Sequence, residues 1–307
     1  MTQLPNFMNC VLVIDKPAGL TSHDVVNRVR RILHERSVGH LGTLDPSATG
    51  VLPLVIGSLT RLAQFYTAAE KAYEGAIRFG FATDTYDADG EAVGIPQNVS
   101  PTLDEVRHLA TGFRGFVEQL PPAFSAKKIQ GVPAYKLARK QKEVVLKPVR
   151  VEIKEFEILS VDGDHASFQA RVASGTYLRS VAHDMGQQMG CGAHLQSLRR
   201  TAVAEFDLAD AHTLEDLATA SERGMIEEFF VHPRKLLPHF PSVTANEDME
   251  ANIRGGRTVN LPEFSKAQRV KVFSGQRELI AIATRVAGTL FHPRIVLVGS
   301  EAARPVR

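Results

Sequence analysis

Asp45 is the residue of this chain whose surroundings best fit a chemical role, because it stands in a glycine-rich stretch before an apolar run. Three glycines flank it, at Gly39, Gly42 and Gly50, and Pro46 follows it directly. Glycine permits backbone angles and close approaches that a β-carbon would obstruct, and proline disfavours the α region at the residue before it. The carboxylate can therefore be held at a fixed angle, as a reaction centre requires. An aspartate before proline in a loop more often stabilises a turn, so this stretch alone does not establish a catalytic role for Asp45.

The spacing of apolar residues predicts the elements that position Asp45. Strands are predicted at 10–14, 51–56, 73–79, 150–160, 166–173 and 198–206, and helices at about 21–33, 60–68, 102–113, 134–140 and 177–189. Thr21 with Asp24 and Thr102 with Glu105 form capping-box patterns at two helix starts. Because strands and helices do not alternate strictly, we predict an α+β fold with a mixed, mainly antiparallel sheet.

The segment Pro238–Pro241 is predicted to be a linker to a strand-rich remainder of the chain. Short strands are predicted there at 258–261, 269–273, 279–285 and 295–298. We therefore expect a large domain at 1–238 and a small β-rich domain at 242–307.

Composition narrows the class of protein. A chain of 307 residues with 44% hydrophobic content can build a large core. No apolar run reaches the ~20 residues that cross a bilayer, and the N-terminus lacks a signal-peptide pattern, so no membrane association and a cytoplasmic location are expected. Cys10 and Cys191 lack disulfide or zinc spacing and are expected to be buried free thiols. No histidine shows metal-ligand spacing, so no metal is expected.

Basic residues are concentrated between Lys127 and Arg150, although the net charge of the whole chain is only +2. That segment holds eight Lys or Arg and one Glu, and 242–307 carries a second, weaker excess of basic residues. Such patches are typical of polyanion-binding proteins, because phosphate contacts supply most of the sequence-independent affinity for nucleic acid. A solvated charged face explains the charge alone equally well.

Five segments, taken together, resemble the TruB family of tRNA pseudouridine synthases. They are Lys16–Ser22, the stretch around Asp45, Lys71–Glu74, Ser174–Ser180 and Cys191–Arg200. The resemblance runs in matching order from about Val11 to Phe206. It implies a pseudouridine-synthase-type catalytic domain that converts the T-loop uridine of tRNA, at position 55 in standard tRNA numbering, into pseudouridine without cofactor or metal.

The resemblance also implies catalytic roles for individual residues. Asp45 would be the nucleophile, attacking either the ribose C1′ or the base C6, and the sequence leaves both routes open. Arg179 would pair with Asp45 and keep it ionised in a dry pocket. Tyr73 would lie against the target base, while Tyr177 and Leu198 would line the uracil pocket. Taken alone, each of these last three would be interpreted as a core residue.

Further residues are implied to bind the RNA. His40 would fill the space that the extruded nucleotide leaves, and Lys16 would support the catalytic loop or contact a phosphate. The insertion at about 121–150 would act as a thumb over the T-stem-loop, and 242–307 resembles a PUA-type RNA-binding domain. The expected backbone-binding residues of the thumb are Lys127, Lys128, Arg139, Lys140 and Lys142. The expected partner is tRNA, bound by a monomer that requires no protein partner.

Three other functions compete with this interpretation. A non-catalytic RNA-folding module would keep the fold, but Asp45, Tyr73 and Arg179 together argue against that as its sole role. The catalytic subunit of a guide-RNA particle would lack the basic insertion. A metabolic α+β enzyme fits poorly, because neither a Gly-x-Gly-x-x-Gly fingerprint nor a P-loop is present. The acidic turn around Asp87 lacks the rest of a calcium-binding loop, so a structural turn is expected there.

Overall fold

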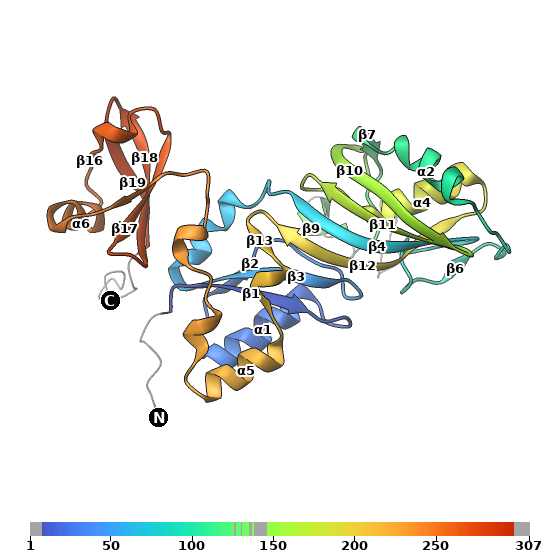
Figure 1. Cartoon of the computed structure of the whole chain (residues 1–307), viewed down its shortest axis with the longest axis horizontal. Helices are drawn as coiled ribbons and strands as arrows, with labels where there is room; N and C mark the ends of the chain where they lie inside the picture. Colours follow the sequence, from blue (N-terminus) through green and yellow to red (C-terminus); the bar gives the residue numbers. More distant parts are fainter. Residues whose placement is uncertain (1–7, 126, 130, 135–136, 138–145, 298–307) are drawn as a thin grey trace.

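The computed structural model describes residues 8–125, 127–129, 131–134, 137 and 146–297 (Figure 1). Within these residues a ten-stranded sheet runs in the order β14-β1-β3-β12-β4-β11-β10-β7, with β2 beside β3 and β13 beside β12. Its strands are β1 Val11–Lys16, β2 Val38–His40, β3 Thr49–Ile56, β4 Lys71–Phe79, β7 Gly115–Gln119, β10 Val149–Asp162, β11 His165–Val172, β12 Ala193–Val203, β13 Phe206–Asp207 and β14 Ala211–His212. Two short hairpins lie outside it, β5 Ala82–Thr83 with β6 Ala92–Val93 and β8 Lys128–Ile129 with β9 Val132–Pro133.

The large sheet is mixed but mainly antiparallel, so the predicted α+β class is confirmed. Within this sheet, only the pairs β1–β14 and β3–β12 are parallel among its described strands. The pair β3–β12 brings Arg200 against Gly50, where a β-carbon would lie 2.2 Å from the Arg200 carbonyl oxygen. Only glycine fits this close approach, and its φ of +98° also lies in the region that other residues avoid.

Alternation along β1 divides its side chains between two cores. Leu12 and Ile14 pack against the helices α1 Ser22–Leu33 and α5 Leu214–Glu222. Val11 and Val13 face the opposite core, which includes residues of the 3₁₀ helix η1 Gly57–Phe65. This two-residue period is the expected behaviour of a central strand buried on both faces.

The other half of the sheet is covered by two further helices, α2 Leu103–Thr111 and α4 Leu178–Met189 (Figure 1). Alternate residues of β10 and β11, including Phe156 and Phe168, pack into the same core as the buried faces of α2 and α4. The capping boxes predicted at Thr21 and Thr102 are both present. The first turn of α4 contacts the loop between β2 and β3 through Arg179 and Asp45, and this contact places the functional site.

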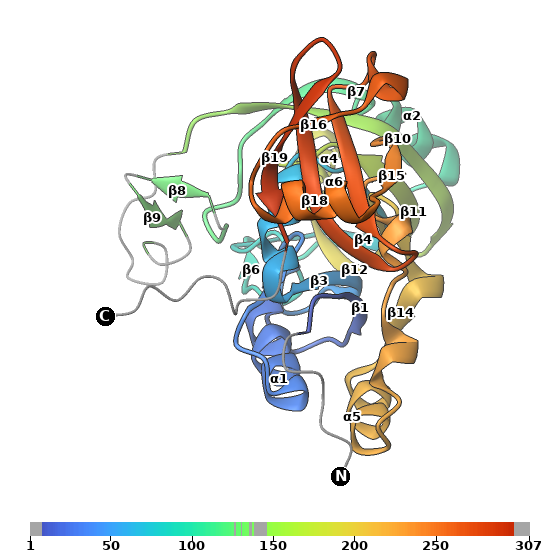
Figure 2. The ribbon, with the colours of Figure 1, turned by 90° about the vertical axis from the view of Figure 1, so that its left-hand side faces the viewer.

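The C-terminal unit is a five-stranded sheet in the order β15-β17-β18-β19-β16. Its elements are β15 Ser242–Thr244, α6 Glu247–Arg254, β16 Val259–Asn260, β17 Arg269–Ser274, β18 Glu278–Ala287 and β19 Leu290–Val296. This β-rich character agrees with the prediction. Figure 2 shows the small sheet in front of the large one. Phe273 and Ile282 share a buried core with Val11 and with Leu236 of the connecting segment, so the two sheets are packed together. The boundary at 238–242 stays a prediction.

Several predicted elements differ in extent. The helix expected at 60–68 is the 3₁₀ helix η1, whose buried Leu59 and Leu62 match a three-residue turn. The strand expected at 198–206 begins earlier, at Ala193, and is interrupted by a turn at Ala204, whose φ is +50°. Helices α5 and α6 were not predicted, and the helix expected at 134–140 lies largely outside the described residues.

Two expectations from composition can be compared with the structure. Cys10 and Cys191 are buried and free, as predicted. No helix in the described part of the chain is long and apolar enough to cross a membrane.

Candidate active site

Asp45 lies in the loop between β2 and β3, and both of its neighbours are anchored. The Ser22 hydroxyl, at the start of α1, accepts a hydrogen bond from the Leu44 N–H at 2.8 Å and lies 3.1 Å from the Leu44 carbonyl, to which it donates. The Pro46 carbonyl accepts from the Gly19 N–H at 2.9 Å. Contacts on both sides fix the backbone at Asp45, so the loop presents its carboxylate in one orientation.

Lys16 holds the same loop from inside the protein. The residue is fully buried, and its Nζ donates to the carbonyls of Pro17, Leu20 and Pro46 at 2.9, 2.6 and 3.0 Å. Burial lowers the pKa of Lys16 to about 8, against the opposing attraction of Asp45. Of the two roles predicted for Lys16, this geometry fits support of the catalytic loop, because the ammonium has no open side for a phosphate.

Arg200 is a second fully buried cation beneath the loop. Its Nε donates to the Val51 carbonyl at 2.8 Å, its Nη1 to the Thr43 carbonyl at 3.2 Å and its Nη2 to the Gly42 carbonyl at 3.0 Å. Burial lowers the pKa of Arg200 below its usual value. The guanidinium thereby ties β12 to both ends of the Asp45 loop.

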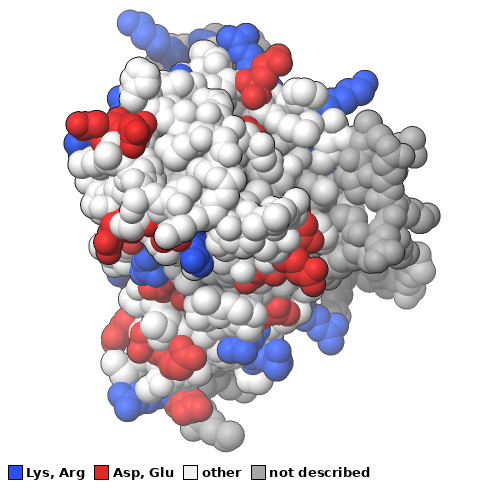
Figure 3. All heavy atoms as spheres, turned by 90° about the vertical axis from the view of Figure 1, so that its right-hand side faces the viewer, with Lys and Arg blue, Asp and Glu red and all other residues white. Residues whose placement is uncertain are grey.

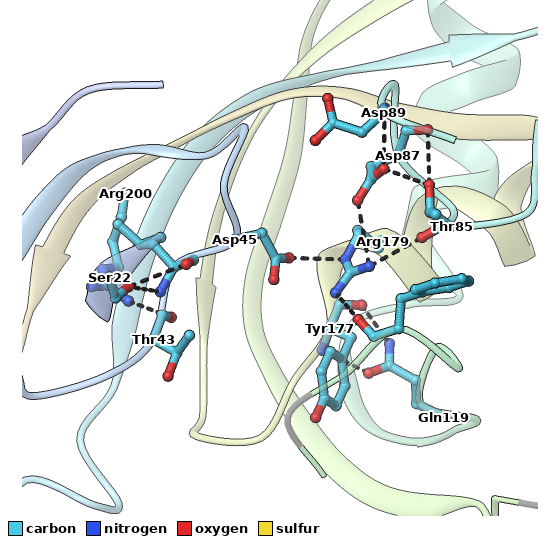
Figure 4. Close-up of polar contacts among 12 residues, drawn as sticks. Ser22, Thr43, Asp45, Thr85, Asp87, Asp89, Gln119, Tyr177, Arg179 and Arg200 are labelled. Carbon is cyan, nitrogen blue, oxygen red and sulfur yellow. Dashed lines mark hydrogen bonds and ion pairs between the residues drawn. The ribbon is translucent and has the colours of Figure 1, made fainter. Parts of the chain in front are cut away.

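Arg179 faces Asp45 across the site from the first turn of α4 (Figure 4). Its Nε lies 2.9 Å from Asp45 Oδ2, and its Nη1 lies 3.4 Å from Asp87 Oδ2. The same guanidinium donates to the carbonyls of Thr85 and Phe124 at 3.1 and 2.9 Å. Every nitrogen of Arg179 is therefore engaged, and the side chain, only 6% exposed, is held in one position.

The environment of Asp45 shifts its acidity in opposing directions. Its side chain is 40% exposed toward the site, yet the crowded walls remove much of its water, and this desolvation raises the pKa of Asp45 above its usual value. Arg179 and Lys16 lower that pKa, while Asp87 raises it. Arg179 thus favours the ionised form of Asp45, although burial has the larger effect on the pKa.

A cavity of about 230 Å³ opens beside the Asp45–Arg179 pair, and its walls include the residues predicted to line a uracil pocket. Its walls include Tyr73 of β4, Leu198 of β12 and Tyr177, the residue that precedes α4. Residues from four separate segments of the sequence therefore surround one small space. The volume is below the ~300–1,000 Å³ typical of drug-sized ligand pockets, which suits a single ring.

A second cavity, of about 490 Å³, lies on the other side of Asp45 and includes His40. Asp87 and Arg179 also line it. Burial and the neighbouring Arg200 lower the pKa of His40. Its Nδ1 is buried without a hydrogen-bond partner among the described residues. His40 is therefore beside Asp45 but outside the smaller cavity.

The predicted thumb is described only in part. Lys127 is half-buried, and Lys128 belongs to β8, but nothing can be said of its side chain. Arg139, Lys140 and Lys142 lie outside the described residues. Figure 3 shows one face of the described part, on which acidic and basic side chains are interspersed rather than gathered by sign.

Three contributors to the site were not predicted from the sequence. Asp87 was expected to form only a structural turn, but it also pairs with Arg179. Ser22 and Arg200 lie in two of the segments that resemble the family, but no role was predicted for either, although both hold the backbone around Asp45. No local signal singled out Arg200, because Arg199 and other polar residues stand beside it in β12. In the described residues no group of three His, Cys, Asp or Glu side chains is placed to hold a metal ion, and the expectation of no cofactor stays a prediction.

Known structures share this fold. The chain matches a subunit of an H/ACA ribonucleoprotein bound to a substrate RNA containing 2′-deoxyuridine, with a TM-score of 0.71 and 23% identity over 95% of this chain and 86% of that one. It also matches the archaeal box H/ACA Nop10–Cbf5 complex, with a TM-score of 0.70 and 24% identity over 99% and 92%. At this identity the likeness concerns the fold alone.

Sequence comparison defines the family. Residues 30–178 match the N-terminal domain of the TruB family pseudouridylate synthases, and residues 179–233 match the C-terminal domain of tRNA pseudouridylate synthase B. A tRNA pseudouridine synthase B of Solibacter usitatus (strain Ellin6076) is 49% identical over 94% of this chain and its own full length. Another, of Azoarcus sp. (strain BH72), is 39% identical over 93% and 94%. The chain belongs to the TruB family of pseudouridylate synthases.

Proposed function

We propose that this protein isomerises the T-loop uridine of tRNA, at position 55, to pseudouridine, with Asp45 as the nucleophile. The observation that carries the proposal is the 2.9 Å contact between Asp45 and Arg179 at the wall of a cavity lined by Tyr73, Tyr177 and Leu198. A carboxylate beside a small, partly apolar cavity is suited to attack the junction of a sugar and a single base.

The reaction rearranges bonds without net gain or loss of atoms. The N1–C1′ bond breaks, a C5–C1′ bond forms, the proton on C5 leaves and N1 gains a proton. Asp45 supplies an electron pair to C1′ or to C6 and recovers it when the intermediate collapses. Both routes start from the ionised carboxylate, which is the form that Arg179 favours. Tyr73 provides a ring face against the base and a hydroxyl that can accept the C5 proton.

The target nucleotide must leave the T-loop to enter the cavity. Extrusion costs a few kcal/mol of stacking and pairing, so a protein group that fills the vacated space lowers the cost. His40 lies in the adjacent cavity with Asp45, which is consistent with that role. The basic 121–150 segment would hold the RNA backbone, so the chain is proposed to act alone, as a monomer, in the cytoplasm where tRNA is available.

A direct test incubates the purified full-length chain alone with an unmodified tRNA transcript. We expect pseudouridine at position 55, mapped by carbodiimide treatment and primer extension. A transcript with cytidine at that position is the matched control and should remain unmodified. Pseudouridine at another position would overturn the proposed target, and no pseudouridine in any tested tRNA would overturn the proposed activity.

A further inference from the structure

Lys71 is a cation of the smaller cavity that the mechanism above does not use. It is the first residue of β4, two positions before Tyr73, so both side chains point to the same face of the sheet. Lys71 lines the cavity together with Asp45 and Tyr73. Its stem lies against the catalytic loop, since a β-carbon at Gly42 would stand 3.6 Å from Lys71 Cε.

The three cations of this cavity differ in what their nitrogens bind. Arg179 is engaged by two carboxylates and two carbonyls, and each nitrogen of Arg200 donates to a carbonyl. Lys71 Nζ makes one hydrogen bond within the described residues, to the Ala69 carbonyl at 2.6 Å. An ammonium has three donors, so two are available to a molecule in the cavity.

The reaction creates negative charge on the base at some distance from Asp45. If Asp45 attacks C1′, the electron pair of the breaking N1–C1′ bond passes into the pyrimidine ring and its carbonyl oxygens. If Asp45 adds to C6, an electron pair moves through C5 to O4. Either route places charge on the base oxygens, and a fixed cation at that position would stabilise the transition state.

We propose that Lys71 is a catalytic residue, whose ammonium donates hydrogen bonds to a carbonyl oxygen of the target uracil and stabilises the negative charge that develops on the base. This inference rests on the proposed function. Desolvation by the cavity walls, together with Arg200, lowers the pKa of Lys71 to about 8, so the group is charged at neutral pH and poorly hydrated. A poorly hydrated cation interacts more strongly with a developing charge than one in water.

The test compares Lys71→Met with Lys71→Arg, the parent and Lys154→Met in single-turnover assays with excess enzyme. Release of tritium from the C5 position of uridine in tRNA measures the chemistry, and filter binding measures the dissociation constant. We expect Lys71→Met to lower the single-turnover rate roughly 100-fold, with little change in tRNA affinity. Lys71→Arg should recover part of that rate, and Lys154→Met, which removes an exposed lysine paired with Glu70, should match the parent.

The outcomes separate this inference from the proposed function. If the parent forms pseudouridine and Lys71→Met does so at the same rate, the role of Lys71 is refuted and the function stands. If Lys71→Met weakens tRNA binding but keeps the single-turnover rate, Lys71 binds a phosphate instead, which also refutes the inference. A parent without activity would refute both. Equal thermal unfolding of parent and Lys71→Met excludes misfolding, and an equally slow Lys71→Arg that folds normally would contradict a role for the charge.

Discussion

Two buried arginines lie on opposite sides of the catalytic loop, and they bind different kinds of atoms. Arg179 reaches Asp45 and Asp87, whose carboxylates face the cavities, whereas Arg200 donates to three backbone carbonyls around the loop (Figure 4). Arg200 also interacts with the side chain of Tyr73, but it contacts no carboxylate among the described residues. Lys16 repeats the pattern of Arg200 with three carbonyls of its own. On one side of the loop Arg179 interacts with the charge of Asp45, and on the other side Arg200 and Lys16 fix the backbone of the loop.

The difference explains how an exposed carboxylate can be both reactive and fixed. A carbonyl carries no net charge, so Arg200 and Lys16 can be buried against the backbone and hold it without neutralising Asp45 by direct contact. Arg179 contacts the carboxylate itself and therefore lowers the pKa of Asp45 more than Lys16 does. Substitutions on the two sides should accordingly affect different quantities, activity on one side and stability on the other.

Among the residues that hold Asp45 in place, Arg179→Met is expected to have the largest effect on activity. Removing the charge partner of Asp45 should lower the single-turnover rate by roughly 10³-fold. Arg179 lowers the pKa of Asp45, so its loss raises that pKa, and the rate, which needs ionised Asp45, should begin to fall at a higher pH on the acid side. A pH–rate profile by tritium release measures both effects. An unchanged acid limb would show that Arg179 does not control the ionisation of Asp45.

Arg200→Met should instead act mainly on stability. The carbonyls of Gly42, Thr43 and Val51 would lose their donors, which we expect to lower the free energy of unfolding by about 3 kcal/mol. Urea denaturation measures this change. The control is Arg199→Met, which removes a partly exposed pair with Asp15 and should cost less than about 1 kcal/mol. Equal losses in the two variants would contradict the distinction between the two sides.

Asp87→Asn should have a smaller effect on the rate, and the direction in which it shifts the pH–rate profile distinguishes it from Arg179→Met. Asparagine keeps the shape but removes the second carboxylate from Arg179, and we expect a rate loss of about tenfold. Because Asp87 raises the pKa of Asp45, its neutralisation lowers that pKa and should move the acid limb to lower pH, opposite to Arg179→Met. The same pH–rate measurement checks this. A shift of the acid limb in the same direction for both variants would contradict the proposed opposing effects of Asp87 and Arg179 on the pKa of Asp45.

The smallest expected effect on chemistry comes from the thumb. Changing Arg139, Lys140 and Lys142 to Ala should weaken tRNA binding and reduce the slope of log affinity against log salt concentration by about 2, because fewer counterions are released. The single-turnover rate at saturating enzyme should stay at the parent value. Filter binding at several salt concentrations tests this. Equal slopes for the variant and the parent would show that these residues do not contact the RNA backbone.

Much of the framework could be predicted because its determinants are local. The capping box of Thr21 and Asp24 and the apolar run of β1 are encoded within a few residues. Helix α5 was missed although Thr213 and Asp216 form the same capping pattern, because its buried face consists of only Leu214, Leu217 and Ala220. A short helix with small residues gives a weak periodic signal.

Site residues that belong to the family motifs could be predicted, whereas contacts that depend on the tertiary fold could not. The pairing of Asp45 with Arg179, 134 positions later in the chain, was expected from the family resemblance rather than from any local pattern, and the two are in contact. The contacts of Asp87 with Arg179, and of Ser22 with Leu44, depend on which turn the sheet brings beside which helix. Such contacts between distant segments have no periodicity to reveal them. The roles assigned to Tyr73, Tyr177, Leu198 and His40 stay predictions.

The central claim is that the Asp45 carboxylate performs the chemistry, and Asp45→Asn tests it most directly. The amide keeps the size of the side chain and removes its charge and nucleophilicity. In single-turnover assays with T-loop uridine labelled at C5, we predict no tritium release above background, with tRNA affinity and the unfolding transition close to those of the parent. Tritium release by a correctly folded Asp45→Asn at a rate near that of the parent would contradict the account.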